Sequence, residues 1–324
     1  MNYIERINEE LKPQSGSNLK AVDLFAGCGG LALGFEAAGI HTTGFEMEAD
    51  ACATYRTNLN GDCHEVKLDV DTEYPEADIV IGGPPCQPFS VGGQQKGLND
   101  SRDGFPIFVS AVERLQPKVF LFENVRGLLY RNKWYFDEIV ERLSGLGYIV
   151  EAELLNAKHF GVPQNRERLI AVGHLGGFEF PTRESGTVTV GEALDPVPPS
   201  KPTDVERKLT ESQDKYIAKY EKASCCKNPR DLHFDRPSRT LTCRNLAGAT
   251  GDMHRIRLPD GSRRRVFTSE AARLQSFPDW YDFQGAENSV FYQIGNAVAP
   301  LFAYHLAKQV RACCESGDEL DAGI

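Results

Sequence analysis

One cysteine stands in a setting that indicates chemistry. Cys86 lies in the stretch GGPPCQPFS, residues 82–90, directly after the apolar run ADIVI, residues 77–81. Prolines on both sides preset the backbone and restrict the residue before each of them, so the turn holds the sulfur in a reproducible place. A thiolate is a nucleophile, and a rigid, accessible turn is typical of covalent catalysis rather than of a buried structural thiol. The polar, glycine-rich residues 90–104 come next and predict a mobile lid.

Charged residues in two later apolar runs could act on the same substrate. Glu123 lies near the end of the run VFLFENV, residues 119–125. A carboxyl group at a strand end in an apolar setting favours its protonated form, which can donate a hydrogen bond. Arg166 and Arg168, in QNRERL, alternate with Glu167 and therefore share one face of a strand. They could neutralise anionic groups near Cys86, although the same pattern is also common on protein surfaces.

A glycine-rich turn predicts a ligand site earlier in the chain. In DLFAGCGGLALGF the glycines open a helix, where close backbone approach and the helix N-terminus favour a polar ligand. Glu46 follows Gly27 by 19 residues, near the spacing at which an acidic residue meets a ribose hydroxyl. The loop does not match GxGxxG cleanly, so it suits an adenosine-type ligand without a pyrophosphate, with a dinucleotide as the alternative. Asp69 is placed to accept from an adenine amino group, or else simply closes a strand-end turn.

These residues can meet only if the strands that carry them lie side by side. Six short apolar runs alternate with stretches of helical periodicity, which is typical of β–α units around a parallel sheet covered on both faces. Five of the runs carry polar groups at their carboxyl ends, where open parallel sheets bind ligands. The sequence therefore predicts an α/β domain with one shared ligand-binding edge. The predicted strands are 21–25, 42–47, 66–70, 78–83, 119–125 and 168–174, and the helices are 31–39, 49–59, 108–116 and 135–147.

The alternation of strands and helices stops after His174. Residues 181–208 are rich in Pro, Ser and Thr, and the residues after 208 form short strand-like runs without β–α alternation. We expect residues 179–290 to form a second, smaller domain. The segment 294–314 returns to an amphipathic helix, with Asn296 as its N-cap and Pro300 in its first turn. This helix should pack on the first domain, which would then comprise residues 1–178 and 291–324.

Composition limits the class of protein and its partners. The 324 residues carry a net charge of −10, but residues 227–273 hold eleven Lys or Arg against five Asp or Glu. A basic segment on an acidic body is typical of a polyanion-binding surface, or else of a solvated loop. The nine cysteines include no CxxC pair, so we expect reduced thiols and no metal site. No apolar run approaches a membrane span, and the first residues lack the apolar core of a secretory signal, so we expect a soluble protein.

Eight motifs occur in an order and spacing that resemble one known family. They are DLFAGCGG, FEME, GGPPCQPFS, FENVRGL, QNRERL, RPSRTLT, EAARLQSFPD and YQIGNAVAP, and they extend from about residue 21 to residue 310. This set is similar to that of the DNA (cytosine-5) methyltransferases of bacterial restriction-modification systems. The resemblance implies a Rossmann-like S-adenosylmethionine-dependent methyltransferase fold with a mixed, mostly parallel sheet. Residues 179–290 would be the smaller target-recognition domain with its hinge.

The resemblance also implies roles for individual residues. Cys86 would be the nucleophile that adds to carbon 6 of a flipped-out cytosine, while Glu123 contacts the ring N3 and the exocyclic amine. Arg168, with Arg166 nearby, would contact the ring carbonyl or phosphates. S-adenosylmethionine would be the methyl donor and S-adenosylhomocysteine the product, with no metal. The residues implied around this cofactor are Phe25, Gly27, Gly29, Gly30, Glu46, Met47 (where family members often have an aromatic residue), Asp69, Pro84, Asn296 and Val298.

DNA-contacting residues are expected in two regions. Gln87 and Ser90, just after the cysteine, would close over the flipped nucleotide. In the basic segment, arginines are candidates for guanine edges, where a bidentate contact contributes roughly 1–3 kcal/mol. These candidates are Arg236, Arg239, Arg244 and Arg255. A run of three arginines is more typical of phosphate binding, and part of it would otherwise form a turn: Arg263, Arg264 and Arg265.

The same resemblance implies partners and leaves rival functions open. It implies double-stranded DNA as substrate, a cytoplasmic, nucleoid-associated monomer, and a cognate restriction endonuclease acting on the same site as a candidate partner. One alternative is a tRNA cytosine-5 methyltransferase, although the Cys-Phe-Thr signature of that branch is absent. A second is a non-catalytic DNA-binding regulator on the same fold, although the Pro-Cys and Glu-Asn-Val elements are intact. A third is a nicotinamide oxidoreductase, which leaves Cys86 unexplained.

Overall fold

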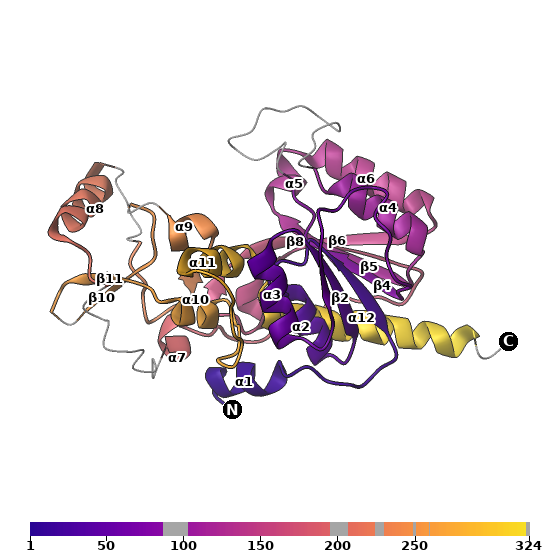
Figure 1. Cartoon of the computed structure of the whole chain (residues 1–324), viewed down its shortest axis with the longest axis horizontal. Coiled ribbons are helices and arrows are strands. Elements are labelled where there is room, and N and C mark those ends of the chain that lie inside the picture. The colour runs from indigo at the N-terminus through magenta and orange to yellow at the C-terminus, as the bar shows by residue number, and fades with distance from the viewer. Residues whose placement is uncertain (87–102, 195–206, 224–229, 249–250, 259, 322–324) are drawn as a thin grey trace.

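The computed structural model describes residues 1–86, 103–194, 207–223, 230–248, 251–258 and 260–321 (Figure 1). Its centre is a seven-stranded sheet in the order β3-β2-β1-β4-β5-β8-β6. Neighbouring strands from β3 to β5 are parallel, whereas β8 runs antiparallel between β5 and β6. The predicted α/β class with a mixed, mostly parallel sheet is confirmed. The strands are β1 (Lys20–Leu24), β2 (His41–Glu46), β3 (Cys63–Glu65), β4 (Ile79–Gly82), β5 (Val119–Val125), β6 (Ile149–Asn156) and β8 (Glu167–His174).

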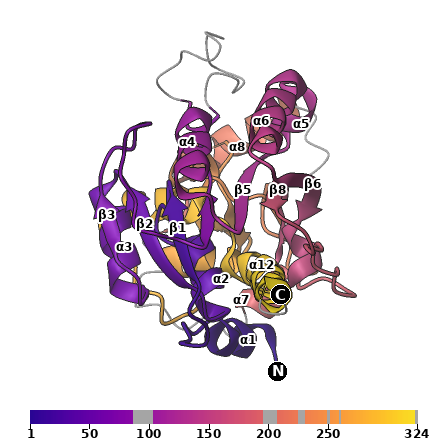
Figure 2. The same ribbon diagram turned by 90° about the vertical axis from the view of Figure 1, so that its right-hand side faces the viewer.

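Helices cover both faces of this sheet, as Figure 2 shows. Alternate residues of β5 divide between the two faces: Phe120 and Phe122 pack on one side, Val119 and Leu121 on the other. Because both faces are buried, this strand is apolar without alternation. The helices on the Phe120 side are α4 (Phe105–Leu115) and α6 (Lys133–Gly145), joined to β5 by the short α5 (Gly127–Tyr130). Those on the other side are α1 (Tyr3–Glu10), α2 (Gly30–Ala37), α3 (Ala49–Asn58) and α12 (Pro300–Asp321).

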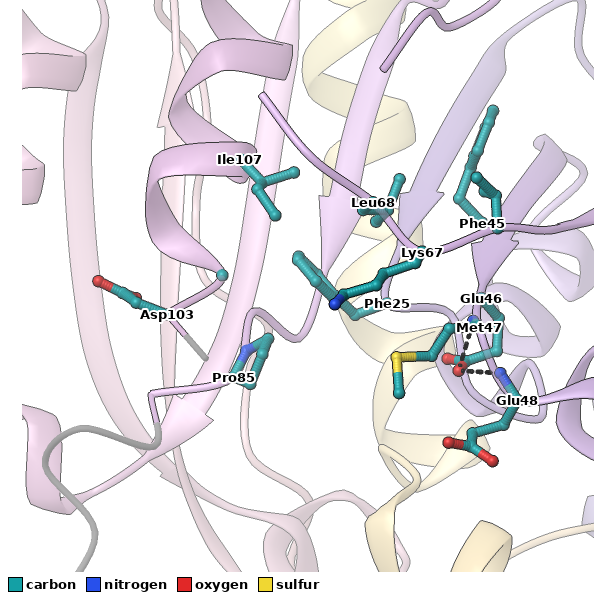
Figure 3. A pocket seen from close by; sticks show the side chains of 12 residues that line it. Phe25, Phe45, Glu46, Met47, Glu48, Lys67, Leu68, Pro85, Asp103 and Ile107 are labelled. Atoms are coloured by element: carbon teal, nitrogen blue, oxygen red, sulfur yellow. Dashed lines mark hydrogen bonds between the residues drawn. The ribbon is translucent and has the colours of Figure 1, made fainter. Parts of the chain in front are cut away.

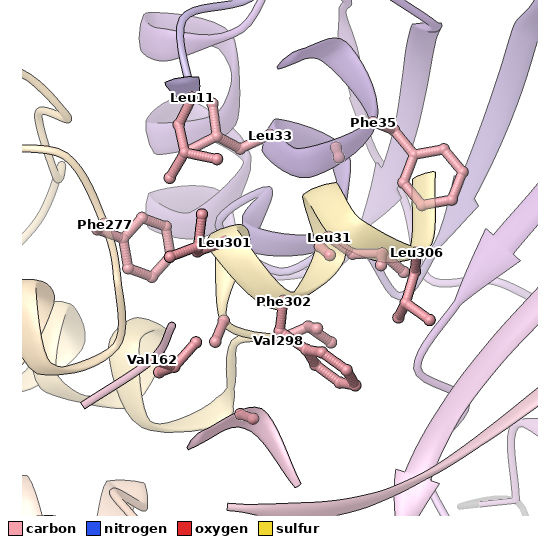
Figure 4. Close-up of a cluster of buried hydrophobic side chains, with 14 of the residues drawn as sticks. Leu11, Leu31, Leu33, Phe35, Val162, Phe277, Val298, Leu301, Phe302 and Leu306 are labelled. Carbon is pink, nitrogen blue, oxygen red and sulfur yellow. The ribbon is translucent and has the colours of Figure 1, made fainter. Parts of the chain in front are cut away.

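The last helix, α12, packs against α2, the helix that follows β1. Leu31 and Phe35 of α2 share one buried cluster with Phe302 and Leu306 of α12 (Figure 4). The two helix backbones approach closely at Gly34, where a Cβ atom would lie 2.4 Å from the backbone nitrogen of Tyr304. A helix near the chain end therefore completes the core around the glycine-rich turn near its beginning.

Several predicted elements differ from those in the structure. The third strand lies at Cys63–Glu65 instead of 66–70, and Asp69 falls in the loop after it. The edge strand β6 was not predicted, because most of its side chains are exposed or half-buried and its residues form no apolar run. Asn296 is the last residue of α11 (Glu287–Asn296) and not an N-cap, since Ala297 is extended at φ −61° and ψ 147°. Pro300 opens α12, where its missing N–H costs nothing.

The described residues between 207 and 265 form a region that projects from the sheet domain at the left of Figure 1. Its described elements include a helix and a two-stranded antiparallel ladder. Charged side chains occupy its interior: Arg255 is fully buried and bonds Asp231 at 2.9 Å and Glu221 at 2.9 Å. The elements here and nearby are η3 (Ala157–Phe160), β7 (Gln164–Asn165), α7 (Val190–Leu194), α8 (Glu211–Ala223), β9 (Ser238–Arg239), α9 (Cys243–Ala247), β10 (Arg255–Arg257), β11 (Arg263–Arg265) and α10 (Thr268–Leu274).

The segment from α10 to α11 packs on the sheet domain, although it falls inside the range expected for the smaller one. Phe277 and Val290 belong to the same buried cluster as α2 and α12. The Tyr281 hydroxyl donates a hydrogen bond to the carbonyl oxygen of Cys28 in the glycine-rich turn. Among the described residues no helix is long and apolar enough to cross a membrane.

Candidate active site

The turn that carries Cys86 is tied to the end of the neighbouring strand. β4 and β5 are adjacent and parallel, so their carboxyl ends lie together. Beyond the paired residues, Nδ2 of Asn124 donates a 2.9 Å hydrogen bond to the carbonyl oxygen of Pro84. This bond holds Glu123 and Cys86 at one edge of the sheet, as their positions at strand ends predict. Cys86 is half-buried, so its sulfur is not enclosed in the core.

A second backbone contact fixes the same turn from the side of α4. Cys86 forms an isolated antiparallel bridge with Asp103, and the N–H of Gly104 donates to the carbonyl of Pro85 at 2.9 Å. Only glycine permits this approach, because a Cβ atom at position 104 would lie 2.4 Å from Cδ of Pro85. The Asp103 carboxylate accepts from the N–H of Phe105 at 3.1 Å and from the Tyr135 hydroxyl.

The surroundings of Cys86 favour the thiol. Burial, and then the negative charge of Asp103, raise the pKa of the Cys86 thiol to about 12. A buried thiol beside a carboxylate holds its proton because the thiolate would lose solvation and face a like charge. A pKa raised in this way favours the protonated sulfur near neutral pH.

Glu123 lies in an ionic environment and not in the apolar one that its neighbours in sequence predict. Its Oε1 is 2.5 Å from Nε of Arg168, and both side chains are 13% exposed. The antiparallel pairing of β5 with β8 brings the two together, since Arg168 faces Val125 in the register. Gly83, three residues before Cys86, lies beside this pair: a Cβ atom there would be 3.8 Å from Oε2 of Glu123. Arg168 and Glu123 thus form a near-buried charge pair next to the cysteine turn.

Arg166 does not share this position. It is 2% exposed, and its guanidinium donates to the carbonyl oxygens of Leu241 at 2.7 Å and Ala297 at 2.9 Å. These bonds connect the end of the sheet to the start of α9 and to the loop before α12. The expectation that Arg166 is free to meet a phosphate or the ring carbonyl is therefore wrong, because its donors are directed into the protein.

The glycine-rich turn adopts a backbone that its residue types explain. Phe25 has φ 59°, an uncommon left-handed conformation for a bulky residue, and Gly27 and Gly29 have φ 55° and 83°. The N–H of Gly27 donates to Oε2 of Glu46 at 2.8 Å, which joins the ends of β1 and β2. A Cβ atom at Gly30 would lie 2.4 Å from the carbonyl oxygen of Val298. Gly30 thus allows the loop before α12 to close on the turn.

A cavity of about 410 Å³ opens between this turn and α4 (Figure 3). Figure 3 shows Glu46 bonded to the backbone N–H groups of Met47 and Glu48 at its border, at 2.8 and 2.9 Å. Asp69 is not among the lining residues, because its side chain accepts bonds from Asp71 and Thr72 in its own turn. The cavity is lined by Phe25, Phe45, Glu46, Met47, Glu48, Val66, Lys67, Leu68, Pro85, Asp103, Gly104 and Ile107.

A second cavity, of about 510 Å³, lies on the other side of Glu46. Glu46 and Glu48 border both cavities, and Gly83 brings the second one to the cysteine turn. Of the residues implied at the cofactor, this cavity holds Gly27, Gly30, Asn296 and Val298. Pro84 is buried and lines neither, while its neighbour Pro85 lines the first. Gly29 lies behind the turn, where a Cβ atom would meet the side chains of Leu59 and Tyr55.

The arginines expected to read bases fall into different environments. Arg244 is exposed and forms no ion pair within the described part of the chain. Arg236 is also exposed and pairs with Asp235 at 3.1 Å. Arg239 is half-buried and pairs with Asp252 at 3.2 Å. Arg255 cannot read a base, because it is fully buried with its guanidinium bonded to acidic side chains. That expectation is wrong.

The arginine run at 263–265 does not form a single phosphate-binding surface. Arg264 is 6% exposed and donates two hydrogen bonds to the Glu270 carboxylate. Arg263 pairs with Asp214 at 2.9 Å and Asp231 at 3.0 Å. Arg265 donates to the carbonyl oxygen of Leu246. Strand alternation in β11 explains the arrangement, since the middle residue of the run must face inward.

Two expected DNA contacts, Gln87 and Ser90, lie outside the described residues, as does most of the predicted lid. Within the described residues no group of three or more His, Cys, Asp or Glu side chains could hold a metal ion.

Fold and site together define the class of protein, and comparison with known proteins then gives the family. The sheet order, with the glycine-rich turn at its carboxyl edge, agrees with a Rossmann-like methyltransferase fold. The profile of the C-5 cytosine-specific DNA methylases matches residues 19–312, and the chain belongs to this family. It is a DNA (cytosine-5) methyltransferase, as the motifs predict.

Curated relatives and solved structures agree with this assignment. The chain is 50% identical to the Type II methyltransferase M.AplI of Arthrospira platensis, over 98% of this chain and 93% of the relative. It is 35% identical to M.NgoFVII of Neisseria gonorrhoeae, over 91% and 87%. Among solved structures, the Entamoeba histolytica methyltransferase EhMeth matches with a TM-score of 0.71 at 17% identity, over 92% and 99%. The S. pombe Dnmt2 methyltransferase matches with a TM-score of 0.70 at 16% identity, over 93% of this chain and 99% of that structure. At these identities both structures show the fold alone.

Sequence reasoning missed several residues that line these cavities. Asp103 and Gly104 are the last two residues of the segment interpreted as a lid, so their contact with the cysteine turn was not predicted. Lys67 and Leu68 line the first cavity and precede Asp69. Because the third strand was predicted at 66–70, Asp69 was expected at the site in place of these two residues. Tyr292 and Gln293 lie in YQIGNAVAP, a motif that was recognised, and could have been found from it.

Proposed function

We propose that this chain transfers a methyl group from S-adenosylmethionine to carbon 5 of a flipped-out cytosine in a short, specific duplex DNA sequence, through a covalent adduct between Cys86 and carbon 6. The bond from Asn124 to the carbonyl of Pro84 carries this proposal. It sets a half-buried sulfur and the Glu123–Arg168 pair at the same sheet edge, beside a cavity suited to the methyl donor.

The residues present fit S-adenosylmethionine. A Cβ atom at Gly27 would have no neighbour within 4 Å, so the turn leaves open space facing the cavity. Glu46 presents a carboxylate at the border of both cavities, where a ribose diol could exchange with the loop N–H groups it now accepts from. Phe25 and Met47 offer apolar surface for an adenine ring. When bound, this cofactor supplies an electrophilic methyl group; Asp69 would reach it only if its turn rearranges.

The chain's own groups make cytosine reactive. Carbon 5 is a poor nucleophile until the Cys86 thiol has lost its proton to water and the sulfur adds to carbon 6, which breaks the 5,6 double bond of the ring and moves an electron pair toward N3. Glu123 would contact N3 and the exocyclic amine, and Arg168 beside it supplies a permanent cation that stabilises the developing negative charge. After carbon 5 carries its methyl group, loss of the carbon 5 proton restores the double bond and expels the sulfur. The base must leave the duplex to reach this edge, at a cost of a few kcal/mol.

The curated relatives named above are Type II methyltransferases, which supports a role in a restriction-modification system with a cognate endonuclease. We place the enzyme in the cytoplasm at the nucleoid, acting as a monomer, because one-base chemistry needs a single active site. The projecting region around Arg244 is the candidate for target recognition. A tRNA substrate is not favoured, because the Cys-Phe-Thr signature of that branch is absent from the sequence.

Two assays test the proposal. Incubation with tritiated S-adenosylmethionine and plasmid DNA, followed by bisulfite sequencing, should reveal one methylated cytosine in a fixed sequence context. A duplex with 5-fluorocytosine at that position should trap the enzyme covalently, since fluorine at carbon 5 blocks the final elimination. Cys86→Ala should abolish the adduct and keep DNA binding. Cys243→Ala, at another half-buried free cysteine, is the matched control. Label transferred to tRNA and not to DNA, or an adduct that survives Cys86→Ala, would overturn the proposal.

A further inference from the structure

An exposed surface of mixed aromatic and basic character begins where β5 ends. Three large apolar side chains there face solvent: Val125 is 53% exposed, Tyr130 68% and Trp134 54%. We call this the α5 surface and define it as Val125, Arg126, Tyr130, Arg131, Lys133 and Trp134. Most surface apolar residues occur singly, so a group of this size within ten residues indicates a partner.

The α5 surface is held in place from beneath. Leu128 is 1% exposed and Tyr135 1%, and both belong to the buried cluster that includes Phe122 of β5. The N–H groups of Tyr135 and Phe136 donate to the carbonyl oxygen of Asn132, which starts α6. The outward side chains therefore stand on a packed segment, and their exposure is not a consequence of a loose loop.

Charge distinguishes this surface from the rest of the molecule. From Asn124 to Phe136 the chain carries three cations and no acidic residue, whereas the whole protein has a net charge of −10. Arg126 pairs with Glu167 at 3.0 Å and Lys133 with Asp137 at 2.6 Å. All four of these side chains are at least 42% exposed, and ion pairs so exposed are weak enough to exchange for another anion. Arg131 is exposed and forms no ion pair among the described residues.

The position of the α5 surface points to the partner. It begins two residues after Glu123, so it continues directly from the catalytic edge of the sheet. In Figure 1, α5 lies on the side of the sheet domain that faces the region of α8 and α9. A duplex whose target base enters the catalytic edge must continue past it, and its phosphates would meet cations there. Cations at this position can neutralise phosphates, and the aromatic side chains beside them can pack against the sugars. Contacts of this kind position a duplex but do not read its sequence.

We infer that the α5 surface binds the phosphate backbone of the duplex that flanks the target cytosine, and so extends the DNA footprint beyond the catalytic edge and the recognition region. Arg131 and Lys133 would neutralise phosphates, with Tyr130 and Trp134 packed against the adjoining sugars. This inference depends only on the enzyme acting on DNA and not on the identity of its nucleophile.

Binding to two duplexes tests it. Both contain the methylated site found by sequencing: one ends just outside it, and the other extends about two helical turns on each side. For the long duplex, Arg131→Gln with Lys133→Gln should flatten the plot of log affinity against log salt concentration by about 1.8, because each phosphate contact contributes about 0.9. Affinity for the short duplex, and the methylation rate on it, should not change.

A matched control removes the same charge from the opposite end of the sheet. Lys20 and Lys118 lie at the amino ends of β1 and β5, and changing both to Gln should leave the long-duplex slope as in the wild type. Tyr130→Ser with Trp134→Ser should weaken long-duplex binding without altering the slope. The inference is overturned if the Arg131/Lys133 variant binds the long duplex normally. That result is expected if the α5 surface binds a protein partner instead of DNA. It is also overturned if both duplexes lose affinity equally, since the cations would then act at the target itself.

Discussion

Replacing Asp103 with asparagine is expected to make Cys86 more reactive before any DNA is bound. The pKa of the Cys86 thiol is raised to about 12, first by burial and then by the charge of Asp103. Below this pKa the thiolate fraction rises tenfold with each pH unit. At pH 8 a pKa of about 12 leaves only about one molecule in 10⁴ as the thiolate, against roughly one in four for a free cysteine.

The size of the effect can be worked out from the bridge between the two residues. Facing side chains across such a bridge put their charges about 7 Å apart, where two unit charges interact by ~2 kcal/mol at an effective dielectric constant of 20. Solvent at a half-buried site reduces this to about 1 kcal/mol, or slightly less than one pKa unit. Asp103→Asn should thus raise the alkylation rate of Cys86 about fivefold at pH 8, while burial maintains the rest of the shift.

The assay is alkylation by iodoacetamide between pH 7 and 10 without DNA, with Cys86 followed by peptide mass spectrometry. Tyr135→Phe is the control, because it removes a donor to Asp103 but keeps the negative charge, and so should not speed the reaction. Faster alkylation in both variants would mean that the turn has loosened. The reasoning is refuted by that result, or by a wild-type Cys86 that reacts as fast as free cysteine at pH 8.

Four further substitutions separate packing from binding. Gly30→Ala should lower the free energy of unfolding in urea by about 1–3 kcal/mol, because the new Cβ would meet a carbonyl oxygen at 2.4 Å; Gly145→Ala, with open space, should not. Arg166→Met should cost about 3 kcal/mol in the same melts, since two buried carbonyls lose their donor; a normal melt with weak DNA binding would contradict this. Arg255→Met should likewise lower the free energy of unfolding, because the buried acidic partners lose their cation. Arg244→Ala should unfold normally but weaken binding to the target duplex by about 1–3 kcal/mol in DNA titrations. An equal loss of affinity for unrelated duplexes would exclude base reading by Arg244.

The sequence predicts the strands of the sheet best where both of their faces are buried. The run 119–125 coincides with β5, because Val119 and Leu121 pack on one face while Phe120 and Phe122 pack on the other. At the edges the signal fails. Ile149–Asn156 is largely exposed, so no apolar run marks it, and the three residues of β3 are too few to produce a pattern.

In the candidate site, too, the sequence predicts features of single residues but not their partners in the fold. The type of residue at 86 and 123 and its place at a strand end can be read along the chain. The partners cannot: Glu123 meets Arg168 only because β8 runs antiparallel to β5. Arg255 was expected to read a base and Arg264 to bind a phosphate, yet Asp231 and Glu270 hold them inside the protein. An arginine-rich segment thus predicts a basic composition but not which of its members face solvent.

The packing of α12 on α2 has a consequence for how this chain is made. The helix after the glycine-rich turn leaves the ribosome early, but the surface that covers it is synthesised only after residue 300. At roughly 5–20 residues per second, the nascent chain must keep that apolar face uncovered for about 15–50 s. A ribosome that stalls late in the message would release a protein in which the apolar face of α2 is still uncovered and the loop before α12 has not closed on the glycine-rich turn.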